Sequence, residues 1–139
     1  MVEYRILTNG GTALLSKRVA ERLARAANTA LRRANSDGDR TVSLVIVGPL
    51  RMTTLGRRMG KSAPTDVLAF PMDPPMLGEI FLCPSEVRKR AVLWGRTPAL
   101  HARYLFVHGL LHLYGYDHEG ETEARRMERL ERKIVEYVL

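Results

Sequence analysis

Residues 108–118 read His108-Gly-Leu-Leu-His-Leu-Tyr-Gly-Tyr-Asp-His118 and contain three of the four histidines of the chain. His108 and His112 are four residues apart, so on a helix both imidazoles project from one face and can reach the same metal ion. Gly115 can end that helix, because glycine readily adopts the left-handed conformation of a C-terminal turn. The chain can then return and bring His118 to the ion. Three protein ligands leave a tetrahedral zinc ion one open position for water, which is the pattern of a catalytic site.

The spacing His-x-x-x-His-x-x-Gly-x-x-His is also that of the metzincin proteases, with one difference. Those enzymes carry a glutamate general base after the first histidine, whereas this chain has Gly109. Glycine cannot accept a proton, so a protease is disfavoured, and phosphodiester hydrolysis is as accessible to an open zinc site as peptide hydrolysis. The sequence identifies no replacement base. Glu119 and Glu121 are typical of a solvated loop or a helix cap, and Asp117 suits a turn and a ligand-buttressing role equally well.

Composition bounds the class of protein. A chain of 139 residues with 45% hydrophobic residues predicts a single domain over residues 1–139. Its formal net charge of +7 favours a polyanionic partner, of which nucleic acid is the commonest, although a merely soluble basic protein has the same composition. Cys83 is the only cysteine, so no intramolecular disulfide is expected. We expect the Cys83 side chain to lie in the core. The single cysteine fits a reducing cytosol, and we expect neither a signal peptide nor a membrane-spanning run, so the expected location is cytoplasmic.

Periodicity predicts an α+β domain with about four strands in one mixed sheet and about five helices. The expected strands are 2–7, 41–47, 65–71 and 78–83, and the expected helices are 12–35, 49–58, 84–94, 97–114 and 122–139. Thr12 can cap the first helix, which is followed by a loop at 36–39, and Thr97 is the expected cap of the fourth helix, with Pro98 at its first position. The fourth helix carries the histidines and is apolar on most sides, so we place it at the centre of the packing. Pro71 indicates the end of a strand or a sheet edge.

Several side chains are expected to have structural roles. Trp94 follows Val87 and Ala91 at helical spacing and is expected on the core face of its helix. His101 lies two helical turns before His108, too far to share the ion, and is interpreted as structural or as part of a pocket rim. Glu131 belongs to the charged face of the last helix, which we expect to form ion pairs in solvent.

Three stretches of the sequence resemble the YbeY family of bacterial rRNA-maturation endoribonucleases. They are residues 108–118, quoted above, Pro64-Thr-Asp-Val-Leu-Ala-Phe-Pro71, and Leu77-Gly-Glu-Ile-Phe-Leu-Cys83. The resemblance implies a metal-dependent, single-strand-specific endoribonuclease that acts in maturation of the 3′ end of 16S rRNA and in ribosome quality control. It also implies one zinc ion, whose bound water attacks the phosphodiester, and the small ribosomal subunit as a partner. The ligands of that ion map onto His108, His112 and His118.

One departure from the family bears on catalysis. The family usually has an arginine where this chain has Met59, next to Arg58 and shortly before Lys61. We interpret Arg58 and Lys61 as the candidate RNA-binding residues of this segment. The alternative to a nuclease is a ribosome- or RNA-binding assembly factor with a structural zinc and little hydrolysis, and a metzincin-like peptidase is a third possibility. Ala69 and Glu79 replace a serine and an aspartate and are mild changes.

Overall fold

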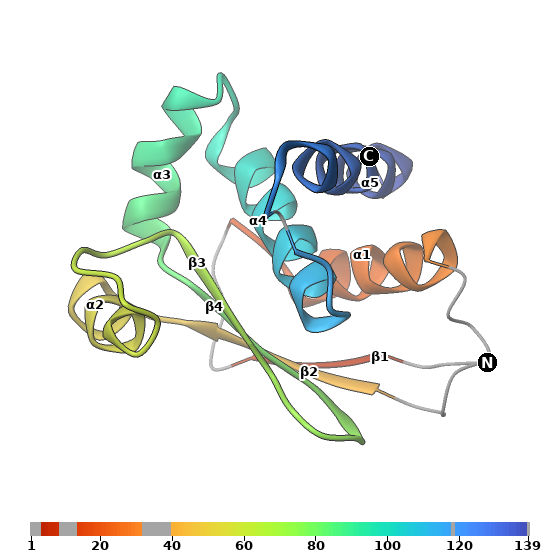
Figure 1. Cartoon of the computed structure of the whole chain (residues 1–139), viewed down its shortest axis with the longest axis horizontal. Coiled ribbons are helices and arrows are strands. Elements are labelled where there is room, and N and C mark those ends of the chain that lie inside the picture. The colour runs from red at the N-terminus through yellow and green to blue at the C-terminus, as the bar shows by residue number, and fades with distance from the viewer. Residues whose placement is uncertain (1–3, 9–13, 32–39, 118, 139) are drawn as a thin grey trace.

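The structure, a computed structural model, describes residues 4–8, 14–31, 40–117 and 119–138. It confirms the α+β class and the mixed sheet (Figure 1). The strands are β1 (Tyr4–Thr8), β2 (Arg40–Ile46), β3 (Val67–Pro71) and β4 (Met76–Leu82). The helices are α1 (Lys17–Ala30), α2 (Pro49–Arg57), α3 (Pro84–Leu93), α4 (Pro98–Leu113) and α5 (Glu121–Val138).

The sheet has the strand order β1-β2-β4-β3. β1, β2 and β4 run parallel, and β3 pairs antiparallel with β4. β3 is therefore an edge strand, and it ends at Pro71 as the sequence predicted, because proline lacks the N–H that a central strand needs.

Side chains of the sheet alternate between two hydrophobic clusters, as the pleat of a strand requires. Ile80 and Leu82 of β4 belong to the main core together with residues of α1, α4 and α5. Phe81 and Cys83 point to the other face and join Met52 of α2. The sheet is thus covered by α1 and α4 on one face, with α5 packed on these two helices, and by α2 on the other face. Cys83 is a buried free cysteine as expected.

Two predicted element details are wrong. The first helix begins at Lys17 and ends at Ala30, because the Ser16 hydroxyl caps it by accepting a 3.2 Å hydrogen bond from the Val19 N–H. Thr12, the predicted cap, and the loop expected at 36–39 lie outside the described residues. Trp94, predicted to be a core residue, follows the last turn of α3 and is 61% exposed.

α4 lies in the middle of the molecule, against the sheet on one side and between α1, α3 and α5 on the others (Figure 1). The Thr97 hydroxyl caps it by accepting a 3.2 Å hydrogen bond from the Leu100 N–H, and Pro98 occupies its first turn, both as predicted. Nine of its residues are buried, which explains why its sequence is apolar nearly all round.

Two glycines let backbone segments approach each other closely beneath α4. A Cβ at Gly78 of β4 would lie 2.5 Å from the Phe70 carbonyl oxygen and 2.5 Å from Leu113 Cδ2 of α4. A Cβ at Gly109 of α4 would lie 3.1–3.2 Å from three side-chain atoms of the buried Ile80. These positions therefore set how near α4 lies to the sheet.

Among the described residues, no helix has both the length and the apolarity needed to cross a bilayer.

We expect Gly78→Ala to destabilise the protein by about 1–3 kcal/mol, because the new methyl group meets a backbone carbonyl that cannot move aside. Gly56→Ala in α2 is the matched control, since its Cβ would meet only the Lys61 side chain at an ordinary 3.4 Å. Urea unfolding of both variants measures the difference. Equal stability of the two variants would contradict the close approach at Gly78.

Candidate active site

Two of the predicted metal ligands, His108 and His112, project from the same face of α4. Their Nε2 atoms are 3.1 Å apart, and the rings are nearly perpendicular, with centroids 4.6 Å apart. Two nitrogen ligands bound to one tetrahedral zinc ion at about 2.0–2.1 Å stand about 3.3 Å apart. The two imidazoles are therefore already arranged as a pair of ligands would be.

The ring of His108 is held by Glu131, a residue of α5 that sequence reasoning assigned to solvent. Glu131 Oε2 accepts a 2.9 Å hydrogen bond from His108 Nδ1, and the Glu131 side chain is only 13% exposed. Because the carboxylate accepts, the proton of the neutral imidazole lies on Nδ1 and the Nε2 lone pair remains available for a metal. This is the carboxylate–histidine arrangement that commonly supports metal ligands.

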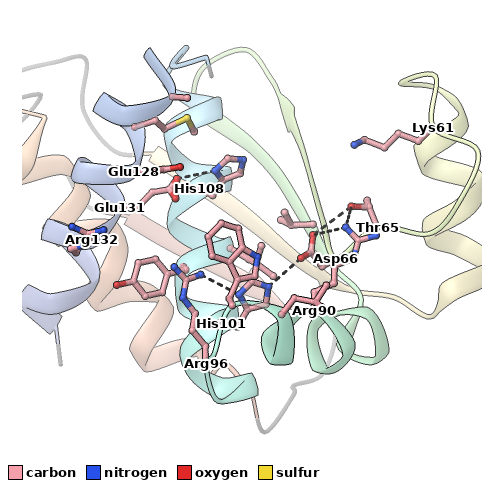
Figure 2. Close-up of a pocket in the computed structure, with 17 residues that line it drawn as sticks. Lys61, Thr65, Asp66, Arg90, Arg96, His101, His108, Glu128, Glu131 and Arg132 are labelled. Carbon is pink, nitrogen blue, oxygen red and sulfur yellow. Dashed lines mark hydrogen bonds and ion pairs between the residues drawn. The ribbon is translucent and has the colours of Figure 1, made fainter. Parts of the chain in front are cut away.

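A signal for Glu131 existed in the sequence. It lies four residues after Met127 and three before Ile134, and both are buried on the core face of α5. Helical spacing alone thus places Glu131 at the border of that face. What the sequence lacked was the position of α5 beside α4, which brings the carboxylate to the histidine (Figure 2).

The third predicted ligand, His118, lies outside the described residues, so its role stays a prediction. Within the part of the chain that the structure describes, no group of three or more His, Cys, Asp or Glu side chains could hold a metal. The described donors that fit an ion are His108 and His112, two imidazoles with Glu131 behind one of them. That donor set suits zinc, which readily takes nitrogen ligands.

The structure gives a reason for a glycine at position 109 that the sequence did not reveal. The residue is buried and faces Ile80, so a glutamate there would force a carboxylate against an apolar side chain of the sheet. Any side chain at this position would press against the buried Ile80, so the packing of α4 disfavours a general base there. The absence of the metzincin glutamate is therefore a consequence of the fold as well as a difference in chemistry.

A second polar cluster lies two turns earlier on α4. His101 is 2% exposed; its Nδ1 accepts a 3.3 Å hydrogen bond from Arg96, and its Nε2 donates one of 3.3 Å to Asp66. Arg90 of α3 donates to the Pro64 carbonyl oxygen at 3.1 Å and lies 3.9 Å from the Asp66 carboxylate. His101 is thus a buried structural residue, as favoured from the sequence, and it also lines a pocket.

The same cluster determines the charge of Asp66. Burial by itself raises the pKa of this carboxyl, but the hydrogen bond from His101 and the positive charge of Arg90 outweigh burial. The pKa of Asp66 therefore lies below its usual value of 3.8. The Thr-Asp pair of the 64–71 segment, both buried, forms a charged anchor between β3, α3 and α4.

A pocket of about 720 Å³ joins the two clusters (Figure 2). Its wall includes His101 and His108 of α4, Glu131 of α5, and Trp94 beyond α3. The basic side chains that line it are Lys61, Arg90, Arg96 and Arg132. Of the two candidate RNA-binding residues, Lys61 lies on this pocket, whereas Arg58 is exposed beyond the end of α2 and does not line it.

Comparisons with known proteins agree with this architecture. A family model described as endoribonuclease YbeY matches residues 7–138. The endoribonuclease YbeY of Cutibacterium acnes is 40% identical over 128 residues, with 83% of each chain covered. That of Salinispora tropica is 39% identical over 112 residues, covering 68% of this chain and 71% of the relative. A solution structure of a Thermotoga maritima protein is 30% identical with a TM-score of 0.63, covering 97% of this chain and 88% of that one.

We expect Glu131→Ala to weaken zinc binding by about 10–100-fold, because His108 loses the carboxylate that fixes its ring and its tautomer. Competition with a chromophoric chelator measures the affinity. Glu136→Ala, which removes an exposed carboxylate from the same helix, is the control and should bind zinc as the wild type does. Equal affinities in the two variants would show that Glu131 does not support the ligand.

Asp66→Asn should lower the free energy of unfolding by about 1–3 kcal/mol near neutral pH, where the wild-type carboxylate is charged and hydrogen-bonded. A carboxyl with a lowered folded pKa stabilises the protein above its unfolded pKa, and that contribution is lost as the pH falls through the folded pKa. The gap between the two proteins should therefore narrow below pH 3.8. Urea unfolding at a series of pH values tests this, and a gap that widens toward acid would refute it.

Proposed function

The chain belongs to the YbeY family of endoribonucleases, and we propose that it is a metal-dependent endoribonuclease that cleaves single-stranded RNA at the His108–His112 site. The observation that carries the proposal is the 3.1 Å approach of the two Nε2 atoms beside a pocket lined by basic side chains. We further propose zinc as the ion, with His118 as the third ligand. The physiological role we assign is maturation of the 3′ end of 16S rRNA and ribosome quality control, in the cytoplasm and on the small subunit.

The chain's own residues supply three parts of the chemistry. His108 and His112 would hold the ion, and Glu131 keeps the proton on His108 Nδ1 so that Nε2 stays a ligand. Lys61 and Arg132 line the same pocket, where a phosphate group would be attracted. When bound, a zinc ion supplies Lewis-acid polarisation of a phosphoryl oxygen and a lowered pKa for water. Gly109 takes no part in proton transfer, since it has no side chain and faces Ile80.

A second candidate function has a specific observation in its favour. Met59 stands where the family usually has an arginine, and its side chain is 51% exposed. Without that charge, this chain could serve as a ribosome-binding assembly factor whose zinc is structural. Tight binding of the small subunit with no metal-dependent RNA cleavage would favour this alternative. A peptidase is disfavoured, because Gly109 stands where such enzymes carry their glutamate and the Ile80 side chain lies against it.

His112→Ala should reduce cleavage of a single-stranded RNA by more than about a hundredfold, since loss of a supporting residue alone reaches that figure and this change removes a ligand. The assay compares wild type and variant purified in parallel, so that a contaminating nuclease would appear in both. Circular dichroism and thermal unfolding show whether the variant is folded. Undiminished cleavage by a folded His112→Ala protein would refute the proposed site.

Metal content tests the third ligand directly. We expect one equivalent of zinc per wild-type chain and loss of that zinc in His118→Ala, because a site with two imidazoles binds zinc far less tightly than one with three. Glu119→Ala, a change in the next residue, is the control and should keep its zinc. Elemental analysis of proteins purified without chelator gives the result, and full occupancy in His118→Ala would exclude His118 as a ligand.

A further inference from the structure

Trp94 is a large aromatic side chain that the fold leaves in solvent. It follows the last turn of α3, is 61% exposed, and lines the pocket that contains His108. It is also the only tryptophan of the chain. An exposed indole on the wall of a pocket is a typical binding contact, because it offers a flat apolar surface and costs little conformational entropy to order.

The indole is not loosely attached. The guanidinium carbon of Arg96 lies 4.8 Å from the centre of the Trp94 ring and 3.7 Å from that of Tyr104. Arg96 is itself fixed by its 3.3 Å hydrogen bond to the buried His101, whose ring lies at 27° to the Trp94 ring. Trp94 is therefore held from the side of Arg96 while most of its surface remains open.

Trp94 and Arg96 form the rim of the pocket, and the charges around this rim favour a polyanion. Arg90 and Arg96 are engaged with Asp66 and His101, and among the described residues Lys61 and Arg132 have no carboxylate within 4 Å. Two of the pocket's carboxylates are already paired, Asp66 with His101 and Glu131 with His108, which leaves Glu128. An aromatic platform beside available cations is the arrangement by which proteins bind single-stranded nucleic acid.

The rim also lies at a useful distance from the metal ligands. His101, against which Trp94 stacks, precedes His108 by seven residues on α4, which is about 10.5 Å along the helix axis. A base on Trp94 would therefore belong to a nucleotide near the one that is cut, and its own phosphate would not be the one at the ion.

We propose that Trp94 and Arg96 form a stacking subsite for one unpaired base of the RNA substrate, in the same pocket as His108. This inference rests on the proposed nuclease function and adds a reason for single-strand selectivity. A paired base is covered by its neighbours in a duplex, so only an unpaired, unstacked base can place its face on the indole. The other basic side chains, Lys61 and Arg132, would contact the backbone on either side.

The test uses binding, which does not depend on cleavage. Because Trp94 is the only tryptophan, its fluorescence reports on the subsite alone when the His112→Ala protein is titrated with a short oligoadenylate RNA. We expect the fluorescence to be quenched on binding. In the same background, Trp94→Ala should bind the labelled RNA about 5–150-fold more weakly by anisotropy, and Trp94→Phe should recover part of the loss.

Two controls separate stacking from other effects. Tyr137→Ala removes an even more exposed aromatic from α5, outside the pocket, and should bind RNA as the parent protein does. An RNA of the same length with abasic sites should bind the parent and Trp94→Ala proteins with equal affinity, because no base is left to stack.

The results distinguish this inference from the function on which it rests. RNA binding that leaves the Trp94 fluorescence unchanged overturns the subsite. Equal RNA affinity of the Trp94→Ala and parent proteins overturns it as well. Cleavage by wild type together with an unchanged KM in Trp94→Ala would leave the nuclease standing without the subsite. Binding that depends on Trp94, in a protein that never cleaves RNA, would leave the subsite standing without the nuclease.

Discussion

The contact between Gly109 and Ile80 is the constraint on which the rest of the site depends. Because Gly109 has no side chain, α4 lies directly on β4, and the histidines on either side of this glycine are fixed relative to the sheet. α5 then packs beside α4 with Met127 and Ile134 in the core, and this position delivers the Glu131 carboxylate to His108. Packing and the arrangement of the site are therefore not independent here: the glycine that stands in place of a metzincin-type base also sets the position of His108 and His112.

The buried pair His101 and Asp66 fixes α4 relative to the sheet at the other end of the pocket. Asp66 stays charged in a buried place because His101 donates to it and Arg90 lies nearby, and burial without these partners would favour the neutral acid. The pair ties β3 to α4, while Arg96 extends the network to the surface, where it supports the Trp94 ring. One wall of the pocket is thus rigid at its base and open to solvent at its rim, which is what a preformed binding site requires.

The predictions from sequence succeeded where local patterns carry the information. Three features follow from properties of single residues and their neighbours. They are the start of α4 at the Thr97 cap and Pro98, the edge position of the strand that ends at Pro71, and the burial of Cys83. The predictions failed where the partner comes from elsewhere in the chain. Trp94 had the spacing of a core residue, but it follows the end of α3 and is 61% exposed there. Glu131 lies among surface charges in the sequence, but its carboxylate contacts His108 of α4.

The sequence by itself determined the α+β class, the central helix that is apolar on most sides and carries histidines one turn apart, and the family to which the chain belongs. These features depend on periodicity and on residues close together in the chain. Only the tertiary structure decided that Glu131 holds the His108 ring, that Gly109 lies against Ile80, and that Lys61, Trp94 and Arg132 share a pocket with His108. These contacts join α2, α3, α4, α5 and the sheet across long separations in sequence. Local propensity carries no record of which faces will meet, and only the packing of the core fixes them.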